Sequence, residues 1–229
     1  MSVNRHRLLP SDPSRSGNVM EPLPHHASFS ALQGYVIRME AGRGLSDLGI
    51  DSQRLKPDEE LGELYDAVLD DADASAIAGE LVDALILTVS VADRGDVDLN
   101  TVLCARTGRT AVALARLQEY AAAAASGVLD LTRLCLLAGR EAGETCRAVR
   151  GLHGAPADPR GRIVVLADEC GDLITALAAI AHRLEIDLEG AFRAKEEVND
   201  TRAISAGVPV ECLCKGWRKG CPRPCADGF

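Results

Sequence analysis

The chain has 229 residues, of which 47% are apolar and only 3% aromatic, and its formal net charge is −9. This length allows one large domain or two small ones, and a core built from Leu, Ala, Val and Ile favours helices. The acidic balance argues against a general nucleic-acid-binding surface. No uninterrupted apolar run reaches the roughly 20 residues of a membrane span, and the first residues lack the continuous apolar segment of a secretory signal. We therefore expect a cytoplasmic protein that does not cross a membrane.

Residues 1–28 are rich in Pro, Ser and Arg, which predicts a disordered N-terminal tail. From Phe29 to about Arg202 apolar residues recur with a period near 3.6, which predicts an all-α fold. Turns rich in Gly, Asp and Pro separate several of the helices. The expected helices cover about 29–42, 56–71, 74–94, 98–126, 129–151, 160–184 and 187–203.

Four short segments in the first half of the chain recur in the same order in the second half. The matches are LQGY at 32–35 with LQEY at 117–120, the glutamates 60 and 63 with 141 and 144, AGELVDAL at 78–85 with ADECGDLI at 167–174, and VDLN at 97–100 with IDLE at 186–189. The offsets are 85, 81, 89 and 89 residues, so they change only where loops differ. This ordered set indicates an internal duplication, with a first repeat at 29–110 and a second at 111–205.

Each repeat carries two pairs of acids on successive helices, and the two acids of a pair are three residues apart. The acids are Glu60, Glu63, Glu80 and Asp83 in the first repeat and Glu141, Glu144, Glu169 and Asp172 in the second. Residues i and i+3 share a helix face, so antiparallel packing would bring four carboxylates together. Their repulsion needs a cation, and hard cations such as Mg²⁺ or Mn²⁺ take oxygen ligands. We therefore expect two candidate metal sites.

Two other interpretations of these acids must be weighed. A single E-x-x-E on a helix is usually a solvated face, but here leucines alternate with the acids and each pair recurs in the other repeat. A di-iron bundle normally needs a Glu-x-x-His pair on each of two helices. None of the five histidines has a glutamate three residues before it. The pattern therefore favours a magnesium or manganese site.

The order E-x-x-E then E-x-x-D resembles the MazG-like family of all-α nucleoside triphosphate pyrophosphohydrolases. Sixteen residues separate Glu63 from Glu80, and twenty-four separate Glu144 from Glu169. EELGEL at 59–64 is similar to the first acidic helix of that family, and residues 168–202 resemble the rest of its domain. The resemblance implies two tandem bundles packed as a pseudo-dimer within one chain, or bundles paired in a homodimer. It also implies hydrolysis of a (deoxy)nucleoside triphosphate to the monophosphate and pyrophosphate.

The resemblance further implies roles for individual residues. The acids of both repeats would hold Mg²⁺ or Mn²⁺, which lowers the pKa of a bound water. Glu59 or Glu60 would help to take the proton of that water. Lys195 and Arg202 would offset charge on the leaving pyrophosphate, and Asn199 would orient a phosphate or a ligand.

The two repeats depart from the family pattern in different ways. In the first, Arg106 and Thr110 stand at the positions of the lysine and the asparagine; in the second, Arg140 replaces the acid that matches Glu59. The pattern therefore leaves open whether the chain has two active sites or one. A non-catalytic scaffold that binds a nucleotide or a protein partner is the alternative function.

Residues 206–229 form a Cys-rich tail outside both repeats. Cys212, Cys214, Cys221 and Cys225 have the spacing C-x-C-x6-C-x3-C, which would suit a structural zinc. Free thiols and disulfides are the alternatives. Four basic residues and Trp217 also lie here, so the tail is the one part of the chain where we expect contact with nucleic acid.

Overall fold

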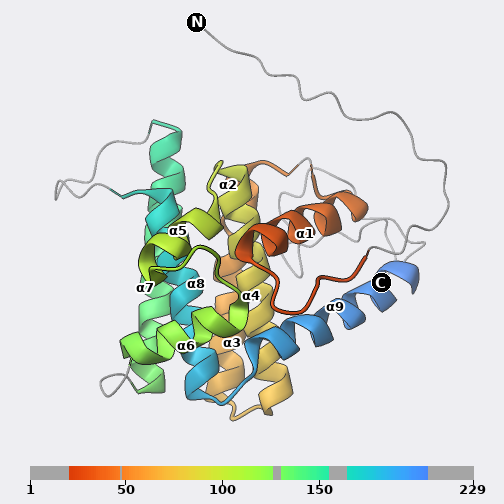
Figure 1. Cartoon of the computed structure of the whole chain (residues 1–229), viewed down its shortest axis with the longest axis vertical. Helices are drawn as coiled ribbons and strands as arrows, with labels where there is room; N and C mark the ends of the chain where they lie inside the picture. The colour runs from red at the N-terminus through yellow and green to blue at the C-terminus, as the bar shows by residue number, and fades with distance from the viewer. Residues whose placement is uncertain (1–20, 47, 126–129, 155–163, 206–229) are drawn as a thin grey trace, which may run out of the picture.

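The computed structural model describes residues 21–46, 48–125, 130–154 and 164–205, which form helices joined by loops and turns (Figure 1). The helices are α1 (Phe29–Gly42), α2 (Ile50–Gln53), α3 (Lys56–Leu69), α4 (Ala74–Arg94), α5 (Leu99–Thr107), α6 (Leu114–Ala125), α7 (Leu131–Leu152), α8 (Leu166–Arg183) and α9 (Leu188–Ser205). The described residues contain no β-strand, so the prediction of an all-α fold is confirmed. The tail predicted at 1–28 lies mostly outside these residues, and the four tail cysteines lie wholly outside.

Polar caps fix where several helices begin. A side-chain oxygen accepts a hydrogen bond from the backbone nitrogen three residues ahead, which satisfies one of the free N–H groups of the first turn. The capping residues with this contact are Ser28, Asp73, Asp98 and Asp130. Six of the seven predicted helices correspond to single helices of the structure, while the short helix α2 was not predicted.

The prediction of one helix over 98–126 was wrong, because the chain breaks there into α5 and α6. Gly108 ends α5 in the left-handed conformation, with φ of 67°, which a residue without a side chain adopts readily. The segment that follows is extended, and the carbonyl oxygen of Val112 accepts a hydrogen bond of 2.8 Å from the backbone N–H of Phe29. The break therefore joins the start of α6 to the start of α1.

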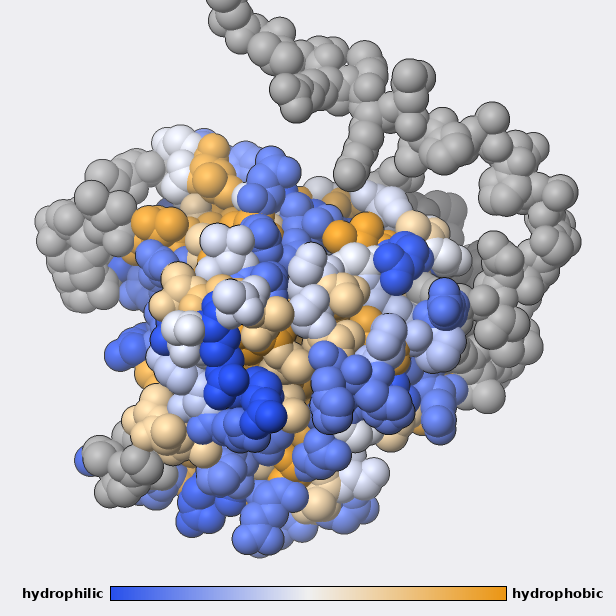
Figure 2. Space-filling model, viewed as in Figure 1, coloured by the Kyte–Doolittle hydropathy of each residue, from blue (hydrophilic) through white to orange (hydrophobic). Residues whose placement is uncertain are grey.

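The two central helices, α4 and α8, pack against each other and are covered by the rest. α3 packs on α4, and α7 packs on α8. Helices α1–α5 lie in the first predicted repeat and are called the first series, and α6–α9 lie in the second and are called the second series. The last helix of each series packs on the central helix of the other: α5 packs against α8, and α9 packs against α4. On the face drawn in Figure 2 hydrophilic residues predominate and apolar patches are small, because most of the apolar side chains lie between the helices.

Helix α4 is the one helix in the described part of the chain whose length and composition alone would allow it to cross a membrane. In this fold it is a core helix: Leu81, Val82, Leu85 and Val89 are fully buried against its neighbours. Glu80 and Asp83 lie on the same helix and are only partly buried. The expectation of a protein that does not cross a membrane stays a prediction.

The same connection between helices occurs twice in the fold. Gln33 on α1 binds the backbone ahead of α5, and Gln118 on α6 binds the backbone ahead of α9. The contacts are Gln33 Nε2 to the oxygen of Val97 (2.9 Å), Leu99 N to Gln33 Oε1 (3.2 Å), Gln118 Nε2 to the oxygen of Ile186 (2.6 Å) and Leu188 N to Gln118 Oε1 (3.2 Å). The two glutamines are 85 residues apart, and the backbone groups that they bind are 89 residues apart. Both offsets occur in the sequence pattern.

A buried ion pair without a counterpart in the second series fixes the loop after α1. The Glu40 carboxylate is 7% exposed and accepts hydrogen bonds from Arg94 Nη1 at 2.8 Å and from Ser90 Oγ at 2.5 Å. Arg94 also donates to the carbonyl oxygens of Leu45, at 3.0 Å, and Leu48, at 2.8 Å. This network joins α1, α4 and the loop between α1 and α2.

Replacing Arg94 with methionine should lower the free energy of unfolding by about 3–5 kcal/mol, because it leaves the buried Glu40 carboxylate without its cation. Urea denaturation measures the loss. Arg116→Met is the matched control, since Arg116 and Glu119 form a surface pair with side chains 55% and 58% exposed. Its effect should be small, because water and salt screen a pair on the surface. Equal losses in the two variants would contradict the role of the buried pair.

Candidate metal centres

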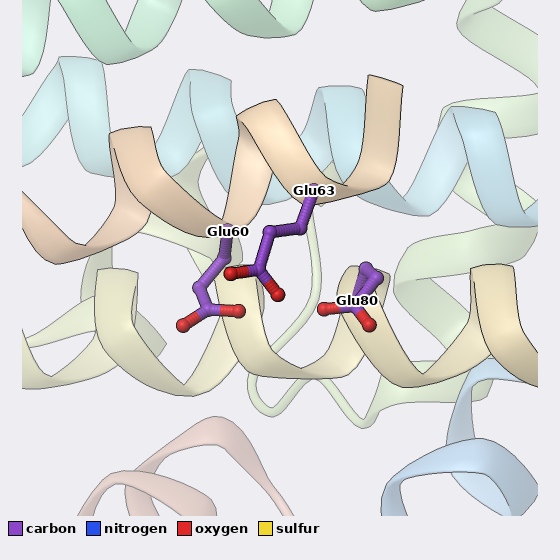
Figure 3. Close-up of side chains that lie close together, drawn as sticks. All are labelled: Glu60, Glu63 and Glu80. Atoms are coloured by element: carbon purple, nitrogen blue, oxygen red, sulfur yellow. The ribbon is translucent and has the colours of Figure 1, made fainter. Parts of the chain in front are cut away.

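The first acidic cluster consists of Glu60 and Glu63 on α3 and Glu80 on α4. One carboxylate oxygen from each residue lies within 4.8 Å of the other two. In Figure 3 the side chains of Glu60 and Glu63 extend from α3 toward α4, where Glu80 lies. Leu61 and Leu64 lie on the adjoining face of α3 and are buried in the core, which fixes the rotation of the helix. In this orientation Glu60 is partly buried and Glu63 is exposed.

The carboxylates of this cluster repel one another in a partly desolvated place. Burial raises the pKa of Glu60 to about 7, and the charges of Asp83, Glu63 and Glu80 add to the rise while Lys195 opposes it. Burial also raises the pKa of Glu80, and the charges of Asp83 and Glu63 add to the rise while Lys195 opposes it. A divalent cation bound here would favour the ionised carboxylates, because it brings positive charge to the cluster.

A lysine from the other end of the chain lies beside the first cluster. The ammonium group of Lys195 on α9 forms an ion pair with Asp83 on α4. Gly79 lies next to this lysine, and a Cβ at that position would make an ordinary van der Waals contact of 3.7 Å with Lys195 Nζ. The structure thus brings the predicted acid and lysine together. Asn199 is partly buried, four residues further along α9, and the side chain of Arg202 lies outside the described part of the structure.

The two glutamates predicted as candidate bases lie in different surroundings. Glu60 is half-buried inside the first cluster. Glu59 is 57% exposed, and its carboxylate lies 2.5 Å from Lys56 Nζ on the same helix. Neighbouring helix positions point about 100° apart, so only one of the two can face α4. The structure does not bring Glu59 into the cluster.

The second acidic cluster consists of Glu141 on α7 and Glu169 and Asp172 on α8, again with one oxygen from each within 4.8 Å of the others. Glu141 is buried, with 5% of its surface exposed. Burial raises the pKa of Glu169 to about 7, with further contributions from the charges of Glu141, Asp172 and Glu144. Glu144 lies close enough to contribute charge and forms an ion pair of 3.2 Å with Arg147.

Sequence reasoning missed Arg106 as a member of this second cluster. Its guanidinium group, carried by α5, forms an ion pair with Asp172 and donates a 2.7 Å hydrogen bond to the carbonyl oxygen of Asp168. Arg106 precedes Lys195 by 89 residues, as Asp83 precedes Asp172, so each cluster receives a cation from the opposite series. The offset of 89 residues is the sequence signal that relates Arg106 to Lys195.

Both clusters offer the ligands that a hard divalent cation prefers. Carboxylate oxygens suit Mg²⁺ and Mn²⁺, and in each cluster one glutamate, Glu60 or Glu169, has a pKa of about 7, raised first by burial and then by the negative charges of its neighbours. Comparison of the chain with protein-family models, with curated proteins and with solved structures finds no match. The argument for function therefore depends on the geometry and on the sequence pattern.

The raised pKa of Glu60 predicts how the stability of the metal-free protein depends on pH. The pKa is about 4.5 in the unfolded chain and about 7 in the fold. The fold therefore favours the protonated form, and this stabilisation, complete below pH 4.5, is lost as the pH rises through 7. Glu60→Gln removes the ionisation. With solvent screening at a half-buried group, it should stabilise the metal-free protein at pH 8 by about 1 kcal/mol, or roughly 2–4 °C in Tm.

Thermal unfolding with a chelator at pH 5 and pH 8 measures this effect, which should be absent at the lower pH. Glu59→Gln is the control, because this neighbouring carboxylate is exposed and should change Tm little at either pH. A Glu60→Gln protein that is no more stable than the wild type at pH 8 would contradict the electrostatic argument.

Proposed function

We propose that the protein hydrolyses a (deoxy)nucleoside triphosphate to the monophosphate and pyrophosphate with Mg²⁺ or Mn²⁺, using the first cluster. The observation that carries this proposal is the convergence of Glu60, Glu63 and Glu80 from two helices, with the ion pair of Asp83 and Lys195 beside them. The sequence resemblance to the MazG-like family supplies the reaction. A triphosphate is the kind of substrate that metal ions at a carboxylate centre can bind through its oxygens.

In the proposed architecture the two helix series are MazG-like bundles paired within one chain. Three features support this arrangement. Gln33 and Gln118 make matching hydrogen bonds at the sequence offsets. The central helices α4 and α8 pack against each other, and the terminal helices α5 and α9 each cover the central helix of the other series.

A cation bound at the first cluster would supply a Lewis acid for the phosphate oxygens and a water of lowered pKa. Of the two candidate bases, only Glu60 lies in the cluster, so we assign to it the acceptance of the proton from water. Lys195 provides positive charge beside Asp83, where it can pair with an oxygen of the leaving pyrophosphate. Asn199 shares the face of Lys195 at i+4 and can orient a phosphate by hydrogen bonding.

The alternative function is a non-catalytic scaffold that binds a nucleotide or a partner. This alternative predicts metal-dependent nucleotide binding without any release of pyrophosphate. A panel of canonical and modified dNTPs and NTPs with Mg²⁺, scored for pyrophosphate and for inorganic phosphate, separates the two functions. Release of inorganic phosphate alone would reject cleavage between the α- and β-phosphates.

Glu63→Gln keeps the shape of the side chain but removes one charged ligand of the first cluster. Turnover of the best substrate in the panel should fall by at least about tenfold, the loss typical of an electrostatic contact at a reacting centre. Asp66→Asn is the matched control, because Asp66 is exposed on the same helix and lies outside the cluster. Turnover in Glu63→Gln equal to that of the control, with metal dependence intact, would reject the assignment.

A further inference from the structure

We infer that the two acidic clusters are not equivalent: the first holds the metal, and at the second Arg106 takes the place of a bound cation. This inference rests on the proposed function and names which of its two candidate centres is loaded. It draws on three observations: the contacts of Arg106, the space made for that side chain, and the charges of α3 and α7. None of them follows from the acidic residues alone.

Arg106 is held at the second cluster by several contacts. It forms an ion pair with Asp172, donates at 2.7 Å to the carbonyl oxygen of Asp168, and lies 4.0 Å from the carboxylate of Asp168. Its side chain is only 20% exposed. A guanidinium stays charged at any physiological pH and binds in a fixed planar geometry. It therefore remains a permanent counter-charge to Asp172.

The helix beneath Arg106 is shaped to receive it. A Cβ atom at Gly171 would lie 2.7 Å from Val102 Cγ1, 3.0 Å from Arg106 Cζ and 3.1 Å from Arg106 Nε, so the missing side chain allows both Val102 and Arg106 of α5 to pack closely on α8. The corresponding position in the first series, 89 residues earlier, is Val82, whose side chain is fully buried. The guanidinium thus lies against the backbone of α8.

The helix that carries the E-x-x-E pair is α3 in the first series and α7 in the second, and the net charges of these two helices have opposite sign. α3 contains five acids and one lysine, whereas α7 contains four arginines and two glutamates. By the offset of 81, Arg140 and Arg147 stand where α3 has Glu59 and Asp66. Both arginines form ion pairs with acids of their own helix, and these acids are Glu141 and Glu144.

The charge balance therefore differs between the two clusters. Three of the four acids predicted for the second site are paired with an arginine, namely Asp172, Glu141 and Glu144. Among the side chains that the structure describes, the first cluster has Lys195 on Asp83 as its ion pair with a cation. A divalent ion entering the second cluster would meet three guanidinium groups, whereas the described acids of the first cluster are accompanied by one flexible ammonium. The first cluster therefore keeps the larger net negative charge.

Binding of Mn²⁺ alone to the full-length protein, followed by calorimetry and by electron paramagnetic resonance, tests this inference. Glu80→Gln and Glu169→Gln are matched variants, since the two residues are 89 apart and lie at equivalent places on α4 and α8. We expect Glu80→Gln to weaken Mn²⁺ binding by at least about tenfold and Glu169→Gln to change it by less than about twofold. Equal weakening in the two variants would overturn the inference.

Three further variants test Arg106 itself. Arg106→Gln should create additional Mn²⁺ binding that disappears again in Arg106→Gln/Glu169→Gln, while Arg106→Lys, which keeps the charge, should bind as the wild type does. Circular dichroism verifies that each variant is folded. A folded Arg106→Gln protein without additional binding would overturn the role of this arginine.

The outcomes also separate this inference from the proposed function. Asymmetric Mn²⁺ binding without pyrophosphate release rejects the reaction and keeps the asymmetry. Pyrophosphate release with equal weakening in Glu80→Gln and Glu169→Gln rejects the asymmetry and keeps the reaction. Absence of Mn²⁺ binding at both clusters rejects the two together.

Discussion

Repulsion between carboxylates that the core holds in place is the constraint on which the rest of this structure depends. Leu61 and Leu64 are buried on α3, and Leu81 is buried on α4, so the helices cannot turn their acids into solvent without exposing the core. The charges must be neutralised where they are. Three means are available at such a site: a proton, an internal cation or a bound metal ion. The two clusters use these means to different degrees.

The exchange of terminal helices connects the electrostatics of the clusters to the topology. Because α9 packs against α4 and α5 against α8, Lys195 meets Asp83 and Arg106 meets Asp172 across the chain. Each acidic cluster thus receives one cation from a helix of the opposite series. The same packing buries α4 and α8 against each other, so core formation and charge compensation are established together. In the proposed function this arrangement places a phosphate-binding lysine next to the metal ligands.

Small differences between corresponding positions change what the clusters can do. The compact ammonium of Lys195, paired with Asp83, can turn to a substrate, while Arg106 lies over Gly171 and donates to a backbone carbonyl of α8. The arginines of α7 add to the effect in the second series. A tandem arrangement allows such divergence, because one cluster can acquire a structural ion pair while the other keeps its ligands.

Sequence reasoning predicted those features that depend on local periodicity. The helical fold follows from the 3.6-residue pattern, and the meeting of Glu60 with Glu63 follows from their i, i+3 spacing. The break at Gly108 was missed, because apolar residues continue on both sides of it and only the backbone conformation ends the helix. The sequence also could not separate Glu59 from Glu60, since helix rotation relative to α4 decides which of two adjacent acids is buried.

The sequence by itself determined that the chain is all-α and that each series carries paired acids on one helix face, because both properties are encoded within a few turns of a helix. Only the tertiary structure decided which cation faces which acid. Arg106 and Asp172 are 66 residues apart, and Lys195 and Asp83 are farther still. Their contacts exist because α5 and α9 cross to the opposite central helix. No local pattern encodes that crossing, since it depends on how the apolar faces of several helices are buried together.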